Sequence, residues 1–402
     1  MTDAGIWRAL SLTEKIHAGK EAYIGYTVRT AGRLDLAALA TAYETVCRAH
    51  PQFAAALDVE DEGYVFVESA VPPDARIGDG DLDRPLAGID LDQHRALSGL
   101  NVVRDGEAAS VCLVAHHSIA DAHHAIDVLA TLWSCYTDLV GGVPAGLPRH
   151  AFPRSLEDLL AERGVTTAAP GAGASRVRPL PERAAVVRDV VQHRMTAAET
   201  AAVAEFSRRE HVTVNGLLSG AILLAESEIR DLPLAELVYR FTVNLRGRLT
   251  PPVGATEGTN VLGGAGFTAT GDMTPDAAGI GRVIGEQLRA GLADGSVQRS
   301  IVDMVSRTPS ADATPWATDA APAVVSMMNW GRIPPMRTPE GLALTGLRSS
   351  SSIREFTALG GYVVSTFGGR IGIDLAWPED DPELPGRLGS LREQLGRITT
   401  RP

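Results

Sequence analysis

The sequence predicts a mixed α/β or α+β protein built from two layered domains. Its 402 residues are too many for one ordinary domain and suffice for two cores of roughly 150–200 residues each. Strand-like and helix-like segments occur in both halves, and no repeat of solenoid length is present. With 45% hydrophobic and 21% charged residues, the composition is that of an ordered globular protein.

Local signals in the first half mark the ends of its elements. Ser11 and Glu14 have the spacing of a capping box, which predicts the start of a short helix. Asp35 is a favourable N-cap residue, and Pro51 ends the helix that it begins. Residues 72–91 are rich in Gly, Asp and Pro, which indicates a surface loop. In order, we expect a helix at 11–19, a strand at 22–30, a helix at 35–50, two strands around the turn at 60–63, strands at 100–104 and 110–115, and a helix from Asp121.

The composition changes to Pro, Gly, Ala and Ser between residues 141 and 181, which is typical of a linker. We therefore predict an N-terminal domain at 1–145, a crossover linker at 146–181 and a C-terminal domain at 182–402. The expected elements of the second half are a strand at 184–195, a helix from Thr196, a helix at 215–229, a strand ending at Arg246, a Gly/Pro-rich loop to Gly266, a helix at 276–293, strands at 324–328, 342–347, 362–367 and 371–377, and a C-terminal helix.

The charge balance limits the partners of the protein. Its formal net charge is −12, and an acidic field repels nucleic acid and anionic membranes, so we expect neither as a partner. Lysine occurs only as Lys15 and Lys20 in the polar N-terminal helix, which argues against a catalytic Schiff-base lysine. Any positively charged site must therefore be formed locally by arginines.

The three cysteines indicate a reducing compartment. Cys47, Cys112 and Cys135 lie in apolar stretches and lack metal-ligand spacing, and a small odd number is typical of cytoplasmic proteins. No export signal opens the chain, and no run of about 18 apolar residues occurs in it. We expect a cytoplasmic protein with no membrane span.

The most informative segment is a histidine cluster at the end of a predicted strand. An apolar strand runs into His116 and His117, and Asp121 follows four residues after the second histidine. Side chains at a strand end can be held rigidly and still face a cavity. A neutral imidazole there can take a proton from an alcohol or an amine near pH 7, which accelerates a reaction by on the order of 10²–10⁴.

Two other interpretations of this cluster remain open from the residues alone. The pair could be ordinary packed or surface histidines. The cluster could also bind a metal ion, because His123 and His124 lie close by in sequence. A helix beginning at Asp121 would, however, direct those two side chains away from the strand-end pair, so we expect no metal site.

Several motifs resemble one acyltransferase family. The stretch from His116 to Ala122 resembles the HHxxxDG signature of the chloramphenicol acetyltransferase-like superfamily, which includes peptide condensation domains and BAHD acyltransferases. More of both halves resembles the polyketide-associated acyltransferases of the phthiocerol/phthiodiolone dimycocerosyl transferase type. These further segments are Leu10 to Glu14, the helix after Asp35, residues 116–139, residues 243–263 and residues 334–342.

The resemblance implies two acetyltransferase-like subdomains with the active site in a tunnel between them. It makes His117 the general base, while His116 shapes the strand end. It gives Asp121 a structural role in an ion pair with an arginine, for which Arg246 is the candidate and Arg248 the alternative. Ala122 stands where the signature has glycine, which raises the question whether the backbone there needs a positive φ.

Other residues are candidates for substrate or donor contacts. Trp330 could line the substrate pocket or belong to the core. Asn260 and the serines at 349–352 could donate hydrogen bonds to an oxyanion, or could lie in solvated turns. Arg337 could contact the phosphates of coenzyme A or of a carrier-protein arm, or could tie down a loop.

The resemblance implies an O-acyltransferase. The donor would be an acyl-CoA or an acyl group on the phosphopantetheine of a carrier protein, with no bound cofactor, and the acceptor a hydroxyl of a polyketide or lipid secondary metabolite, as in antibiotic biosynthesis. An acyl carrier protein or a polyketide synthase is a candidate partner, and we expect a monomer. The alternatives are a free-standing condensation enzyme that forms amides and an inactive module that binds a carrier protein.

Overall fold

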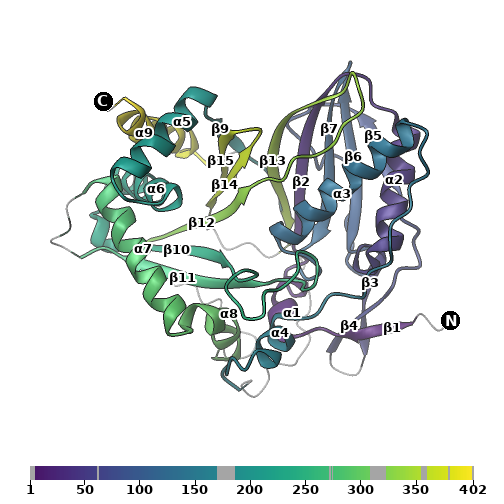
Figure 1. Cartoon of the computed structure of the whole chain (residues 1–402), viewed down its shortest axis with the longest axis horizontal. Coiled ribbons are helices and arrows are strands. Elements are labelled where there is room, and N and C mark those ends of the chain that lie inside the picture. The colour runs from purple at the N-terminus through teal and green to yellow at the C-terminus, as the bar shows by residue number, and fades with distance from the viewer. Residues whose placement is uncertain are drawn as a thin grey trace.

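The fold is a pair of sheet-rich halves that lie side by side, as the computed structural model in Figure 1 shows. It confirms the mixed α/β class. The structure describes residues 5–60, 63–169, 186–270, 273, 275–307, 323–354, 360–378 and 381–400. The N-terminal and C-terminal ends of the chain lie on opposite sides of the molecule in this view.

The first half is organised around a six-stranded sheet with the strand order β5-β6-β7-β2-β13-β8. Its strands are β5 (Ala75–Asp79), β6 (Ser98–Asp105), β7 (Ala108–His116), β2 (Tyr23–Ala31), β13 (Ala343–Ile353) and β8 (Val186–Asp189). Helices α2 (Leu36–Ala49) and α3 (Ala122–Val140) pack on each other beside this sheet (Figure 1). A small sheet of β1 (Ile6–Ala9), β4 (Gly63–Glu68) and β3 (Ala55–Glu60) lies below it, near the short helix α1 (Leu12–Ala18).

The second half contains another six-stranded sheet, in the order β11-β10-β12-β14-β15-β9. Its strands are β11 (Leu262–Thr268), β10 (Leu237–Asn244), β12 (Ala323–Arg332), β14 (Gly361–Phe367), β15 (Arg370–Ala376) and β9 (Val191–Arg194). Its helices are α5 (Ala197–Arg209), α6 (Val214–Arg230), α7 (Ala277–Ala293), α8 (Ser296–Arg307) and α9 (Leu384–Thr399). Within the described part of the chain, no single helix is long and apolar enough to cross a membrane; α5 and α6 together pass that test by length and composition, but they bend by 103°.

Two strands of the C-terminal range belong to the sheet of the first half. Strand β13 pairs antiparallel with β2 from Ala343↔Ala31 to Ser352↔Tyr23, and β8 pairs with β13. Directly after β8, the chain crosses at Val190 to the second sheet, where β9 pairs with β15. The predicted boundaries at 145 and 182 divide the chain into consecutive segments. The two sheets are not divided in this way, because β8 and β13 come from the C-terminal segment and belong to the first sheet.

The local signals located most helices, and the structure differs from the predictions where those signals were weak. The capping box at Ser11 and the N-cap at Asp35 begin α1 and α2 as predicted. Strand β5 lies within the predicted loop at 72–91, and helix α4 (Leu156–Glu162) lies within the predicted linker, whose residues 170–181 are outside the described residues. Strand β11 was missed because its sequence is rich in glycine, and α8 was not predicted.

Candidate active site

The end of β7 places the two neighbouring histidines in different environments. His116 lies opposite Tyr23 of the neighbouring strand β2 and is fully buried. Its Nδ1 is 2.7 Å from the Ser118 hydroxyl. Burial, reinforced by the neighbouring His117, lowers the pKa of His116 to about 3. This side chain stays neutral and belongs to the packing of the strand end.

His117 faces a cavity of about 290 Å³. Its backbone N–H donates to the Ala22 carbonyl at 2.7 Å, which fixes the first residue beyond the strand. Its Nδ1 is buried with no hydrogen-bond partner of acceptable geometry among the described residues, so Nε2 is the nitrogen left to face the cavity. Burial lowers the pKa of His117, against the opposing effects of its own carbonyl and of Asp121. The ring is neutral at pH 7 and can accept a proton.

The cavity lies between the two sheets and is mostly apolar. Its apolar lining comes from both halves: Ile24, Tyr26, Ala122, Val190, Met328, Trp330, Ile353, Val363 and Ala376. Its polar lining consists of the serines at 326 and 349–351 together with Arg188. A basic nitrogen in an apolar cleft is an arrangement suited to proton transfer shielded from water.

A second and larger pocket, of about 830 Å³, opens further along β13. Arginines and aspartates line it, among them Arg29, Arg348 and Asp83, and its lining contains no histidine or cysteine. Because this lining offers no imidazole or thiol, the smaller cavity at His117 is the candidate for the chemistry.

Asp121 is buried and acts as a structural centre behind the cavity. Its Oδ1 accepts the backbone N–H of His124 at 3.0 Å and so caps α3. Its Oδ2 accepts the Arg246 guanidinium and the Val261 N–H, each at 2.8 Å. Burial acts to raise the pKa of Asp121, but the ion pair with Arg246 outweighs it and holds the pKa below its usual value. The carboxylate does not line the cavity.

Arg246 connects the second half to the first through this carboxylate. Besides Asp121, its guanidinium donates to the carbonyls of Ala255 at 2.9 Å and Gly258 at 3.4 Å. The alternative partner, Arg248, is exposed. Removing either member of such a buried pair leaves an uncompensated charge that costs roughly 3–5 kcal/mol. The pair therefore constrains how the two halves meet behind His117.

Ala122 does not require the glycine that the signature has at this position. It is the first residue of α3, and it is absent from the non-glycine residues with positive φ among the described residues, which are Glu21, His211 and Asp231. Its methyl group lies at the cavity wall. The substitution of alanine for glycine therefore adds apolar surface and no backbone strain.

The remaining sequence-predicted residues have different positions. The Asn260 amide donates to the His117 carbonyl at 2.7 Å, so it holds the backbone of the histidine instead of pointing at an oxyanion. Trp330 is both core and pocket wall, since it is 7% exposed, lines the cavity and packs on Tyr26. Arg337 is exposed and forms an ion pair with Asp138 at 2.8 Å, outside the cavity lining.

The serines at 349–352 lie on β13 and have different environments. Ser349 donates both its N–H and its hydroxyl to the buried carboxylate of Asp374, at 2.7 Å each. Ser350 has a buried hydroxyl with no partner among the described residues, and Ser351 lines the cavity. Strand β13 therefore supplies the serines to the site, and none of them lies in a solvated turn.

His123 and His124 turn away from His117, as the predicted helix requires. His124 is buried, with Nδ1 2.9 Å from the Gly258 carbonyl and Nε2 beside the Gln52 amide. Within the described ranges, no group of three or more His, Cys, Asp or Glu side chains has the arrangement of a metal site.

Among the residues at the site that sequence reasoning missed is His17 of α1, which contacts His117 directly. Its ring stacks on that of His117, with 4.2 Å between the ring centroids and 10° between the ring planes. Nothing local marks this contact, because it depends on the packing of α1 against the end of β7. The capping box that fixes the start of α1 is the nearest signal in the sequence.

The chain resembles known proteins over nearly its whole length. Polyketide synthase associated protein 5 from Mycobacterium tuberculosis matches with a TM-score of 0.83 and 27% identity over 99% of both chains. The trichothecene 15-O-acetyltransferase from Fusarium sporotrichioides shares the fold, with a TM-score of 0.69 and 12% identity over 98% of this chain and 95% of that one. The fold and the cavity at His117 thus define a two-lobed acyltransferase of the chloramphenicol acetyltransferase-like class.

The sequence comparisons identify the family within that class. The phthiocerol/phthiodiolone dimycocerosyl transferase from Mycobacterium ulcerans is 31% identical over 416 aligned residues, which cover 98% of this chain and 97% of that protein. The family described as "Phthiocerol/phthiodiolone dimycocerosyl transferase C-terminus" matches residues 184–376. The chain belongs to the phthiocerol/phthiodiolone dimycocerosyl transferase family of acyltransferases.

Proposed function

We propose that this protein is an O-acyltransferase with His117 as its general base. It moves an acyl group from an acyl-CoA or acyl-carrier-protein thioester to a hydroxyl of a polyketide or lipid secondary metabolite. The observation that carries the proposal is the placement of His117, whose Nδ1 is buried and whose ring faces an apolar cavity between the two halves. Its similarity to dimycocerosyl transferases supports a lipid or polyketide acceptor.

The reaction needs a proton acceptor and no covalent acyl-enzyme. With the acceptor hydroxyl beside Nε2, His117 removes its proton as the oxygen attacks the thioester carbonyl. The tetrahedral intermediate collapses, the carbon–sulfur bond breaks, and the departing thiolate takes the proton from the imidazolium. The products are an ester and a free thiol.

The neighbouring groups orient the base and stabilise developing charge. Asn260 fixes the His117 carbonyl, and Asp121 with Arg246 holds the start of α3 against the second half. Among the cavity-lining serines of β13, Ser350 and Ser351 are our candidate donors to the oxyanion, because the Ser349 hydroxyl already donates to Asp374. An apolar cavity excludes water, which would otherwise compete with the acceptor for the thioester.

We also propose that the enzyme works as a cytoplasmic monomer, with its donor supplied either by coenzyme A or by a carrier protein of a polyketide synthase. The reducing compartment is supported by three free, buried cysteines. Both donors carry the acyl group on a phosphopantetheine arm. An assay with acyl-CoAs and with an acylated carrier protein distinguishes them.

The test is an acyl-transfer assay with a panel of substrates. The protein is incubated with acetyl-CoA, longer acyl-CoAs or an acylated carrier protein, plus an alcohol or the matching amine. Thiol release and product mass are measured. We expect ester formation by the wild type and a loss on the order of 10²–10⁴ in His117→Ala.

Two other outcomes of this assay would support the alternative functions. Product from the amine alone would identify an amide-forming condensation enzyme. No transfer from any thioester, with retained binding of the carrier protein, would identify an inactive binding module.

A further inference from the structure

The ring of His17 covers one face of the proposed general base. The two imidazoles lie nearly parallel, 4.2 Å apart between centroids and 10° apart in plane. His17 is not among the residues that line the cavity, and the reaction described above gives it no task. A parallel contact at this distance restricts rotation of both rings about their side-chain bonds.

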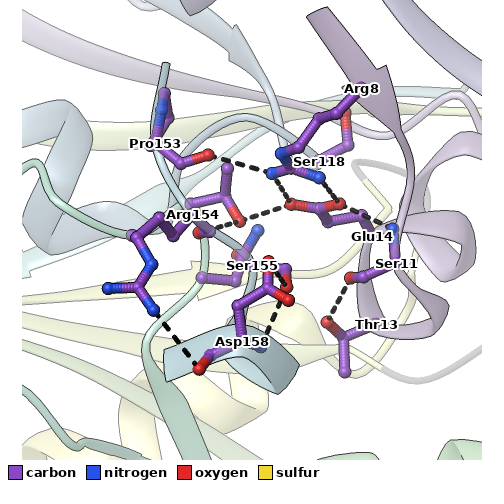
Figure 2. A network of polar contacts seen from close by, with 12 residues as sticks. Arg8, Ser11, Thr13, Glu14, Ser118, Pro153, Arg154, Ser155 and Asp158 are labelled. Carbon is purple, nitrogen blue, oxygen red and sulfur yellow. Dashed lines mark hydrogen bonds and ion pairs between the residues drawn. The ribbon is translucent and has the colours of Figure 1, made fainter. Parts of the chain in front are cut away.

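Helix α1, which carries His17, is anchored to three other segments. Buried Glu14 accepts two hydrogen bonds from Arg8, at 2.6 and 2.7 Å, and one from the Thr259 hydroxyl at 2.7 Å; Figure 2 shows Arg8 and Glu14 facing each other. Thr13 donates its N–H and hydroxyl to Glu157 of α4, at 2.9 Å each. A short helix held at so many points presents His17 at a fixed position.

The same anchor reaches the loop that holds Asp121. The Thr259 carbonyl accepts the Asp121 N–H at 2.8 Å, while the Thr259 hydroxyl donates to Glu14. The stacking ring of α1 and the start of α3 are therefore fixed by one residue of the second half. This connection fixes the segments that carry His17 and His117 relative to each other.

The ring plane of His117 lacks the support that a carboxylate gives in other general-base sites. Asp121 points to Arg246 and not to Nδ1, which has no hydrogen-bond partner of acceptable geometry among the described residues. Asn260 donates to the backbone carbonyl of His117, and that carbonyl and the Asn260 side chain also interact with the His117 ring. The flat contact with His17 therefore adds to these contacts in setting the direction of Nε2.

The charges around His17 keep its own ring neutral. Burial, and after it His117, His116 and Lys20, hold the pKa of His17 well below its ordinary value. The charged groups on α1, just after it and on the helices packed against it are Glu14, Lys15, Lys20, Glu157, Asp158 and Glu162 of α4, and Arg299, Asp303 and Arg307 of α8. His17 therefore presents an uncharged ring to His117.

We propose that His17 is a positioning residue for the general base: its neutral ring fixes the plane of His117 so that Nε2 points at the acceptor hydroxyl. This inference rests on the proposed function of His117. It predicts that the site needs a flat, uncharged ring at position 17 and does not need a second titrating group.

The test compares His17→Phe with His17→Ala in the acyl-transfer assay. We expect His17→Phe to stay within about threefold of the wild-type kcat, because the ring is kept. We expect His17→Ala to lose at least about tenfold in kcat, with the donor KM within about twofold, because misplacing a catalytic group by about 1 Å costs up to 10²-fold. Removing the ring also exposes the His117 imidazolium to water, which raises its pKa, so the acid limb of kcat/KM moves to higher pH in His17→Ala but not in His17→Phe.

His193→Ala is the matched control, because His193 lies on β9 in the other sheet and does not line the cavity. It should retain wild-type kcat and the wild-type acid limb. Thermal unfolding of each variant separates a folding defect from a positioning defect. Wild-type kcat and acid limb in folded His17→Ala, or equal impairment of His17→Phe and His17→Ala, would overturn the inference while an inactive His117→Ala still supports the proposed function. Full activity of His117→Ala would instead overturn the proposed function.

Discussion

Two buried acid–arginine clusters of this protein look alike and do different things. Asp121 and Arg246 join the first half to the second at the start of α3, directly behind His117. Glu226 is equally buried, but it accepts Arg230 and Tyr362, at 2.6 Å each, and also Arg387, all within the second half. This difference shows that the burial of an ion pair does not by itself indicate a role in the reaction. We expect that only the cluster that spans the two halves affects the reaction.

The largest expected effect comes from removing one arginine from each cluster. Arg246→Met and Arg387→Met should each lower the free energy of unfolding by roughly 3–5 kcal/mol, because each leaves a buried carboxylate without its partner. Urea unfolding measures this. Only Arg246→Met should also lower kcat of the folded enzyme, by at least about tenfold. An equal loss of kcat in Arg387→Met would break the distinction between the clusters.

The two halves should also differ in their stability at acidic pH. Burial lowers the pKa of His50 and His124 to about 4 and that of His116 to about 3, and all three belong to the first half. The unfolded chain binds these protons near pH 6.5, so their contribution to stability is complete above pH 6.5 and is lost as the pH falls below it.

At pH 5 each of these histidines should cost on the order of 1–2 kcal/mol relative to pH 7. In the second half, burial acts to raise the pKa of Glu226, but its hydrogen bond with Arg387 outweighs this and holds the pKa below its usual value, so Glu226 stays ionised at pH 5. Hydrogen exchange at the two pH values should therefore show faster opening of β7 and α3 than of α6. Faster opening of α6 would contradict the account.

The smallest expected effect concerns the hydroxyl that links α1 to the Asp121 loop. Thr259→Val removes the donor to Glu14 and should cost about 1 kcal/mol, as should Ser219→Ala, which removes the partner of the Tyr239 hydroxyl in the second half. Thermal unfolding checks both values. Thr259→Val alone should reduce the rate of acyl transfer. If both variants keep the wild-type rate, the anchor of α1 has no part in positioning the base.

The parts of the fold that the sequence predicts are those encoded over a few residues. The capping box at Ser11 and the N-caps at Asp35 and Asp121 depend on neighbours three residues away, and all three begin the predicted helices. The partners Asp121 and Arg246 are 125 positions apart, and their pairing was expected only because the motifs resemble a known family.

The parts that could not be predicted depend on contacts between distant segments. Strand β13 has an ordinary strand pattern, and nothing in its composition tells that it joins β2 of the first half. For Asn260 the sequence leaves open an oxyanion donor or a solvated turn, and its actual partner, the His117 carbonyl, is fixed by the path of the 245–261 loop. The stack of His17 on His117 likewise arises only when α1 packs beside the end of β7.

The central claim is that His117 takes the acceptor's proton, and the pH dependence of acyl transfer tests it most directly. The rate of thiol release from an accepted thioester, in the presence of the acceptor alcohol, is measured against pH for the wild type and His117→Ala. The account predicts a single acid limb below pH 6.5 for the wild type, because burial lowers the pKa of His117. It also predicts a His117→Ala rate lower by at least about 100-fold with no such limb. A His117→Ala enzyme within about tenfold of the wild type, with the same acid limb, would contradict it.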